Sequence, residues 1–402
     1  MPPFLKKWLS IYDEETAVFG WTVLLLLLLS AATVILNNYA ETAFLKRFGV
    51  KHLPVIYMLN SALTFILMGL LGGVMARLPG IRLLTYMLFF FAGSIAAFRF
   101  LIPLEIDLLY PVLYILKAQY VILIGLLFWN LANDLFNTRQ AKRLFPLIAA
   151  GGAIGTILGS AVTPVLAGLL AMDNLTLVYG VLMALAALVV AKMGARFPTL
   201  VIVREKPAKS ESKPSVLNQF QDVRRLMKKS DLVWILMLLT LIPNVIIPVL
   251  NYQFNFAIDS QFGSEDGLVR FFAYFRSFMS LVSLLLLLFV SKAYSRWGLA
   301  VALMFHPLNY ALVFIAFLVQ FNVFSAIYAR LSTTVIRTTL NKPVTDILMG
   351  VFPVSYRAAL RPFLRGTIVR VGLFAGSSII LVAGQFFHPK YLSLVVLPLV
   401  IA

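Results

Sequence analysis

The 402-residue chain contains no cysteine, only three histidines, and charged residues at only 12% of its length. The absence of cysteine excludes disulfide frameworks, thiol catalysis and cysteine-based zinc sites. The scattered histidines, His52, His306 and His388, form no cluster of metal-ligand spacing. A typical soluble domain carries about 25% charged residues, so this chain has too little polar surface for a water-exposed globule. Soluble enzymes, nucleic-acid-binding modules and disordered proteins are therefore excluded.

Long apolar runs take the place of the missing charge, and 61% of the residues are hydrophobic. A membrane-spanning helix needs about 20 mostly apolar residues, and such runs lie near 17–39, 53–76, 83–103, 108–136, 146–170, 175–195, 232–257, 267–290, 298–319, 323–341 and 366–386. The runs are continuous rather than alternating, which predicts an all-α membrane protein. A twelfth run begins at Tyr391 and stops at Ala402. At roughly 18 Å of helix this run is too short to span, so we expect a truncated twelfth helix and a natural protein that continues.

Basic residues outnumber acidic ones, with 34 Lys and Arg against 16 Asp and Glu and a net charge of +18. When the N-terminus is placed inside, most of the basic residues fall in cytoplasmic loops. Outer loops then contain only Lys46, Arg47, Lys51 and Lys390. Basic residues gather on the cytoplasmic side of membrane proteins, so the charge predicts a cytoplasmic N-terminus and contact with membrane lipids, and it does not indicate nucleic-acid binding.

The longest polar stretch divides the apolar runs into two sets of six. We predict an N-terminal six-helix bundle over 1–197, a basic cytoplasmic linker with an amphipathic helix over 198–230, and an incomplete C-terminal bundle over 231–402. Short motifs recur at nearly one interval, which indicates an internal duplication. They are Asn-Tyr at 38–39 and 251–252, Phe-Gly at 48–49 and 262–263, and Leu-x-Pro at 144–146 and 360–362. The plan predicts a 6+6 helix bundle with a pseudo-twofold repeat and a truncated twelfth helix.

Small residues recur at helical spacing in the second, fifth, eighth and eleventh runs, and such faces let helices approach closely in lipid. We expect these four helices to form the contact between the two halves. The residues are Gly69 and Gly73, then Gly151, Gly155 and Gly159, then Ser277, Ser280 and Ser283, and finally Gly372 and Gly376.

Three sequence segments resemble known transporters. The loop from Gly73 to Arg82 resembles the loop between helices two and three of the major facilitator superfamily, although Arg77 stands where that superfamily usually has Asp. The segments 128–147 and 42–54 resemble the ATP/ADP carrier (nucleotide transporter) family of bacteria and plastids, especially its branch fused to helical repeats. The resemblance implies nucleotide transport by an antiporter, residence in a bacterial inner membrane, and a further C-terminal domain beyond residue 402.

Charged residues inside the apolar runs are the candidate binding groups, because such charges are costly in lipid and usually functional. Counting residues along the helices places Lys117, Arg276 and Arg337 near mid-membrane, with Arg330 two turns from Arg337. We predict that these cations bind an anionic substrate in one central cavity, together with Tyr110, Tyr114 and Asn251. No acidic residue is predicted at their depth. The alternative is that Arg330 and Arg370 snorkel, or that these cations pair with helix-end carbonyls, Glu105 or Asp107.

Further polar residues indicate gating rather than binding. Asn130, Asn133 and Asp134 share one helix face, and they are predicted to form an inner gate, together with Arg77, or a polar contact between helices rather than to bind the substrate. His306 precedes a proline and is expected to be a hydrogen-bonded helix histidine, with a proton relay as the alternative. No ATP-hydrolysing P-loop, metal site or catalytic motif is present in the sequence, which predicts neither an enzyme nor a cofactor.

Three functions remain open from the sequence. The first is a secondary transporter or exchanger of an anionic, phosphate-bearing solute by alternating access, nucleotide-like by family resemblance. The second is a transporter or flippase of an anionic lipid or amphiphile, whose headgroup would be the partner. The third is a membrane anchor or scaffold that no longer transports and serves a missing C-terminal domain.

Overall fold

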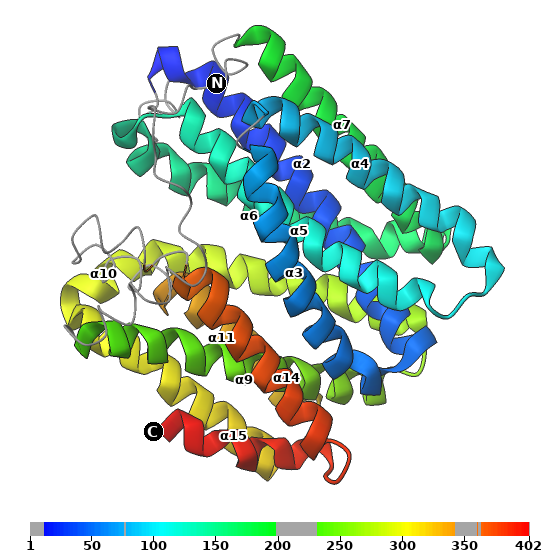
Figure 1. Cartoon of the computed structure of the whole chain (residues 1–402), viewed down its shortest axis with the longest axis vertical. Coiled ribbons are helices and arrows are strands. Elements are labelled where there is room, and N and C mark those ends of the chain that lie inside the picture. The colour runs from blue at the N-terminus through cyan, green and yellow to red at the C-terminus, as the bar shows by residue number, and fades with distance from the viewer. Residues whose placement is uncertain (1–11, 76–77, 198–230, 342–359, 361–362, 402) are drawn as a thin grey trace. The chain divides into compact units, whose positions relative to one another are not determined.

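The computed structural model describes residues 12–75, 78–197, 231–341, 360 and 363–401, and every regular element within these ranges is helical (Figure 1). The long helices are α2 (Asp13–Ala43), α3 (Leu53–Met75), α4 (Gly80–Leu101), α5 (Leu109–Leu135), α6 (Thr138–Leu170), α7 (Leu175–Arg196), α9 (Asp231–Gln261), α10 (Glu265–Val319), α11 (Val323–Ile336), α14 (Val369–Ala383) and α15 (Leu392–Ile401). Three π-helical segments, Phe44–Gly49, Arg337–Asn341 and Phe363–Ile368, extend α2, extend α11 and precede α14, respectively. The all-α prediction is confirmed.

Helix length follows the apolar runs. Eight helical stretches among the described residues are long and apolar enough to cross a membrane, and two shorter apolar helices, Met304–Val319 and Pro389–Val400, accompany them. One boundary differs from the prediction, since the runs 267–290 and 298–319 fall within the single helical element α10. The polar segment between them contains no proline, so its charges do not interrupt the helical backbone.

The chain divides into two compact units that are interleaved in sequence. Unit 1 comprises residues 1–48, 69–204 and 264–284, and unit 2 comprises 49–68, 205–263 and 285–402. Most of α3 therefore belongs to unit 2, and the first part of α10 belongs to unit 1. These two segments are the second and eighth predicted helices, which are equivalent positions in a 6+6 plan. The predicted linker 198–230 lies outside the described residues.

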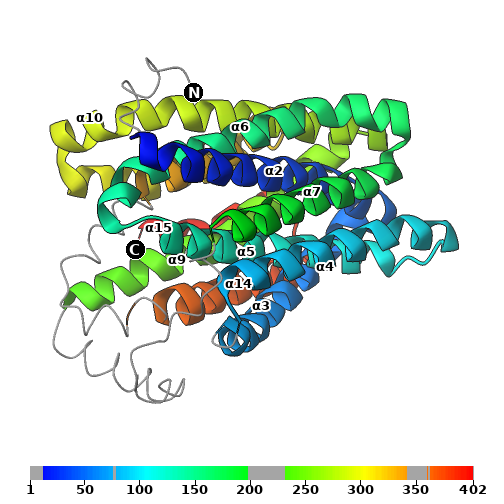
Figure 2. The ribbon, with the colours of Figure 1, turned by 90° about the horizontal axis from the view of Figure 1, so that it is seen from above.

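Within unit 1, α6 lies along α2 through its glycine face (Figures 1 and 2). A Cβ added to Gly159 would lie 2.7 Å from the carbonyl oxygen of Ala31, and one added to Gly155 would collide with the backbone of Leu27. Only glycine permits two helix backbones to approach this closely. The glycine spacing therefore fixes the contact between α2 and α6.

Unit 2 repeats this contact between α14 and α9. A Cβ on Gly372 would lie 2.8 Å from that of Asn244, and one on Gly376 would collide with the carbonyl of Val245. In residue number, Gly372 follows Gly155 and Gly376 follows Gly159 by the same interval. Each unit thus contains its own copy of the same helix–helix contact, as an internal duplication predicts.

These contacts correct one expectation. The glycine faces of the fifth and eleventh helices each contact the first helix of their own half, α2 or α9. The eighth helix does meet the fifth, because Ser277 of α10 donates to the Ile157 carbonyl of α6 at 3.0 Å. A row of small residues specifies a close approach but not which neighbour approaches, so the sequence alone leaves the partner undetermined.

Candidate functional site

A buried ionic cluster lies inside unit 1, and its centre is the carboxylate of Glu41 at the end of α2. Glu41 Oε2 lies 3.8 Å from Lys117 Nζ of α5 and accepts a hydrogen bond from Arg276 Nη2 of α10. Glu41 is 5% exposed and Lys117 is 6% exposed. We call Glu41, Lys117, Arg276 and Asn38 the Glu41 cluster. It brings two cations and one carboxylate together.

Aromatic rings and an amide fix the two cations of the Glu41 cluster. Lys117 Nζ lies 4.0 Å from the centroid of the Tyr114 ring, and the Arg276 guanidinium lies 5.0 Å from that of Phe272. Asn38 Oδ1 accepts a hydrogen bond from Arg276 Nη1, while its amide group donates to Thr163 Oγ1 of α6 at 3.1 Å. The cluster therefore joins α2, α5, α6 and the first part of α10.

Glu41 is the residue that the sequence interpretation misses, and the expectation that no acid matches these cations is wrong for Lys117 and Arg276. The apolar run of the first helix ends near residue 39, so hydropathy places Glu41 beyond the spanning segment. In the structure α2 continues to Ala43 and then as a π-helix to Gly49, which keeps Glu41 helical and buried. The available signal is helical spacing, since Glu41 lies three residues after Asn38.

A second set of predicted residues lines a cavity of about 190 Å³ within unit 2. Arg330, Thr333, Thr334 and Arg337 reach it from α11 and its π-helical end, and α9 and α10 supply the other walls. The remaining lining residues are Ile247, Leu250, Asn251 and Tyr310. We call this space the arginine cavity. Its two guanidinium groups give it the positive charge and its threonines and asparagine give it hydrogen-bonding capacity.

The two sites are related by the internal repeat. The Asn-Tyr pair at 38–39 recurs at 251–252, so Asn38 of the Glu41 cluster corresponds to Asn251 of the arginine cavity. Three residues after these asparagines stand Glu41 and Phe254, respectively. The Arg330 guanidinium lies 5.3 Å from the centroid of the Phe254 ring. A carboxylate thus accompanies the cations of unit 1, whereas an aromatic ring occupies its place in unit 2.

His306 lies beside the arginine cavity and is 3% exposed. Its ring centroid lies 4.4 Å from that of Tyr310, a cavity-lining residue. Within the described ranges neither ring nitrogen of His306 has a hydrogen-bond partner, and neither has the Tyr310 hydroxyl. The expectation of a hydrogen-bonded helix histidine is therefore wrong for the described part of the chain.

Tyr110 lies in a different environment from Tyr114. Its hydroxyl accepts a hydrogen bond from Arg47 at 3.3 Å, and Arg47 also pairs with Glu265 and with Asp173 at 2.9 Å. Tyr39 donates to Asp173 at 2.8 Å. This group ties the π-helical end of α2 to the starts of α5 and α10, so Tyr110 is held by a structural ion-pair network. Glu265 belongs to this network as the first residue of α10.

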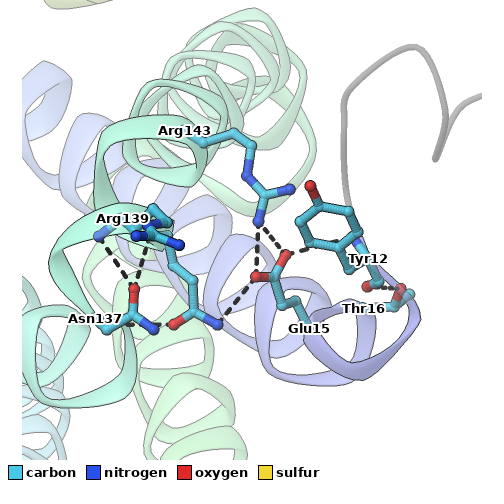
Figure 3. Close-up of polar contacts among 7 residues, drawn as sticks. Tyr12, Glu15, Thr16, Asn137, Arg139 and Arg143 are labelled. Carbon is cyan, nitrogen blue, oxygen red and sulfur yellow. Dashed lines mark hydrogen bonds and ion pairs between the residues drawn. The ribbon is translucent and has the colours of Figure 1, made fainter.

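A third ionic group connects the start of α2 with the start of α6 (Figure 3). Glu15 accepts hydrogen bonds from Arg143 Nη2 at 2.5 and 2.7 Å and from the Gln140 amide at 3.0 Å. Asn137 caps α6 by accepting from the backbone N–H groups of Arg139 and Gln140, which satisfies donors that the first helical turn leaves unpaired. Part of the block that resembles ATP/ADP carriers thus builds this junction.

The predicted gating residues lie at the end of α5. Asn133 donates to the carbonyl of Trp129 in its own helix at 2.8 Å. Asp134, at the end of α5, is close to the start of α4, because a Cβ added to Gly80 would be 3.8 Å from Asp134 Oδ2. A carboxylate beside the start of a helix interacts favourably with the helix dipole. Asn130 is half-buried on the same helix. Arg77 lies outside the described residues. A gating role for this group stays a prediction.

The structure thus assembles the predicted binding residues in two places. Lys117, Arg276 and Tyr114 lie together in unit 1, while Asn251, Arg330 and Arg337 line the cavity of unit 2. Because the predicted cations belong to different units, their convergence on one cavity stays a prediction.

Comparison with known proteins gives these sites a context. The family described as TLC ATP/ADP transporter matches residues 91–351. A segment of 66 residues is 35% identical to ADP,ATP carrier protein 3 of Rickettsia bellii (strain RML369-C), and the match covers 16% of this chain and 13% of that protein.

Solved structures show the fold. The chain is similar to the crystal structure of a mutant of the nucleoside transporter NupG, with a TM-score of 0.67 over 95% of this chain and 96% of that chain. It is also similar to the crystal structure of a D-xylose-proton symporter, with a TM-score of 0.62 over 96% and 95%. Each is 15% identical in sequence. These likenesses confirm the major-facilitator-like fold that the sequence resemblance implies for the predicted 6+6 plan.

Proposed function

This chain belongs to the TLC ATP/ADP transporter family, and on that premise we propose that it moves phosphate-bearing, nucleotide-type solutes by alternating access. Its family and its structural neighbours are transporters rather than enzymes, and the chain is a multi-pass membrane protein. The observation that supports an anionic substrate is the arginine cavity, in which two guanidinium groups lie two turns apart on one helical segment.

The lining of the arginine cavity suits a phosphate group. A guanidinium presents a planar fork of N–H donors that can bind phosphate oxygens in pairs. Thr333 and Thr334 add hydroxyls and Asn251 adds an amide between the two arginines and α9. Sites that enclose a whole drug-sized ligand measure about 300–1,000 Å³, so a cavity of about 190 Å³ holds part of a nucleotide. We assign that part to its phosphate chain.

Uptake into liposomes tests this function. The full chain is reconstituted, and entry of labelled ATP or ADP is measured with and without unlabelled nucleotide inside. An exchanger takes up label only when nucleotide is available inside to leave. We expect saturable uptake that depends on internal nucleotide. Uptake no greater than in protein-free liposomes would contradict transport of nucleotides, and uptake independent of internal nucleotide would contradict exchange.

Arg337→Gln tests the role of the cavity within that experiment. It removes a bidentate donor and a charge, so we expect nucleotide uptake to fall at least tenfold, about 1.4 kcal/mol of lost binding free energy. Arg337→Lys should retain part of the activity, since an ammonium keeps the charge but loses the fork. Arg370→Gln is the matched control, because Arg370 lies on α14 of the same unit and does not line the cavity. An equal loss of nucleotide uptake in the two Gln variants would contradict substrate binding in the arginine cavity.

We also propose the bacterial inner membrane as the location, with a cytoplasmic N-terminus. The asymmetry of basic residues between the two sets of loops supports this orientation, and the Rickettsia relative supports a bacterial origin.

A further inference from the structure

A buried tyrosine hydroxyl without a hydrogen-bond partner belongs to a residue that lines the arginine cavity. Tyr310 is 2% exposed, and it is the residue that α10 contributes to the described lining, while α9 and α11 supply the others. Within the described ranges its hydroxyl has no hydrogen-bond partner. The charge of Arg337, which lines the same cavity, acts on this hydroxyl. Tyr310 therefore brings an unused polar atom close to a cation of the cavity.

This hydroxyl does not help to stabilise the fold. A buried polar group that lacks a partner has lost its hydrogen bonds to water and gained none in exchange, and native proteins contain few such groups. A phenylalanine at position 310 would fill nearly the same space without that cost. The hydroxyl of Tyr310 therefore calls for an explanation other than stability, and a ligand that accepts a hydrogen bond provides one.

An unpartnered hydroxyl alone does not identify a binding site. In the described part of unit 1 the hydroxyl of Tyr179 on α7 is likewise buried without a partner, but Tyr179 does not line the arginine cavity. Tyr310 differs because two guanidinium groups and the amide of Asn251 line the same space. Guanidinium groups attract anions, and the oxygens of an anion accept strong hydrogen bonds. The inference thus depends on where Tyr310 lies and not on its burial alone.

We propose that Tyr310 is a further substrate-binding residue, whose hydroxyl donates a hydrogen bond to a phosphate oxygen held by the arginines of the cavity. The inference rests on the proposed function, which assigns the phosphate chain to this cavity, and deepens it by naming the contribution of α10. A phosphate group that binds both Tyr310 and Arg337 joins α10 to the π-helical end of α11. Substrate binding therefore connects two helices of unit 2 through the ligand itself.

Tyr310→Phe separates this role from a structural one, because the substitution keeps the ring and removes only the hydroxyl. Inorganic pyrophosphate is the probe, and its binding to the purified full chain is measured by titration calorimetry. We expect its affinity to fall about tenfold, as for the loss of a hydrogen bond to a charged group. Without pyrophosphate, the thermal unfolding midpoint should stay unchanged or rise, because the variant removes a buried hydroxyl that lacks a partner.

Two further variants show where the effect arises. Tyr179→Phe is the matched control, since it makes the same change at a buried hydroxyl without a partner in the described part of the other unit, and the affinity for pyrophosphate should not change. Arg337→Gln accounts for pyrophosphate bound at other cations, such as Lys117 and Arg276. Once Arg337→Gln has weakened binding in the cavity, adding Tyr310→Phe should cause no further loss of affinity.

Wild-type affinity for pyrophosphate in Tyr310→Phe overturns the inference, and so does a wild type that binds no pyrophosphate. If the variant does not fold, or unfolds at a lower temperature, the hydroxyl serves the fold and the inference is also wrong. The same loss of affinity in Tyr179→Phe, or an undiminished loss in the Arg337→Gln background, would exclude a direct contact in the cavity. If nucleotide uptake into liposomes fails while Tyr310→Phe still weakens pyrophosphate binding, only the transport function is contradicted, so the two failures are distinguishable.

Discussion

Arg47 and Glu265 form a bidentate ion pair in which Arg47 Nε donates to Oε1 at 2.5 Å and Nη2 donates to Oε2 at 2.7 Å. The pair joins the π-helical end of α2 to the first residue of α10. Asp173 contacts the same guanidinium through Nη1. One arginine thus holds three segments of unit 1 that are far apart in sequence.

We expect this pair to stabilise unit 1 measurably. A double-mutant cycle with Arg47→Gln, Glu265→Gln and the double variant, followed by thermal unfolding in detergent, should give a coupling free energy of about 1–2 kcal/mol for partly buried, charged hydrogen bonds. The neighbouring pair of Arg270 and Asp266 is exposed and four residues apart on one helix, so its cycle should give only about 0.3–0.5 kcal/mol. Equal values for the two pairs would contradict a structural role for Arg47.

The glycine contact between α6 and α2 predicts a strong position effect within one helix. Gly155→Ala places a methyl group against the backbone of Leu27, and such overpacking costs about 1–3 kcal/mol. Gly168→Ala on the same helix meets no atom within 4 Å and should be neutral or slightly stabilising, because alanine favours helix. Unfolding midpoints of the two variants check this, and similar midpoints would show that the close approach of α6 to α2 is absent.

The equivalent contact in unit 2 makes the same prediction a second time. Gly376→Ala meets the carbonyl of Val245 and should destabilise the protein by an amount similar to Gly155→Ala, about 1–3 kcal/mol. A midpoint like that of the wild type would contradict the equivalence of the two helix pairs.

The junction between α2 and α6 predicts different effects at two adjacent acids. Glu15 is buried and accepts hydrogen bonds from Arg143 and Gln140, so Glu15→Ala should cost about 1–3 kcal/mol. Glu14 is exposed on the same turn, and Glu14→Ala should change stability by less than about 0.5 kcal/mol. Chemical unfolding of the two variants measures both, and a cost at Glu14 as large as at Glu15 would contradict the junction.

The proposed orientation can be tested directly because the chain has no cysteine. A cysteine at Asp107, an exposed residue between α4 and α5, should react with an impermeant thiol reagent added outside whole cells. A cysteine at Arg139, exposed at the start of α6, should react only after the membrane is permeabilised. The reverse pattern would invert the topology.

The helices could be predicted well from the sequence because the length of an apolar run decides whether a helix can span a membrane. The duplication could be predicted too, since recurring motifs need no knowledge of packing. The pairing of Glu41 with Lys117 and Arg276 could not, because the apolar run stops before Glu41 while the helix continues through a π-helical segment. The expected partner of Gly155 was also wrong, because a small-residue face does not identify the helix that approaches it.

The structure places Tyr110 apart from Lys117, although the sequence groups them, for a related reason. Tyr110 and Tyr114 share a face of α5, and helical spacing alone groups them with Lys117. Lys117 does lie over Tyr114, but Tyr110 is bonded to Arg47, whose position depends on long-range packing of α2 against α5. Spacing along one helix therefore predicts neighbours on that helix and not the partners that other helices supply.

The shared carboxylate of Glu41 has an electrical consequence. Moving one elementary charge across the whole membrane potential involves about 2.3 kcal/mol per 100 mV. Without Glu41, any displacement of Lys117 and Arg276 through the field would carry two charges; with it, the same displacement carries one. In the proposed alternating-access cycle, the Glu41 carboxylate would therefore offset one of the two positive charges that Lys117 and Arg276 bring into the field.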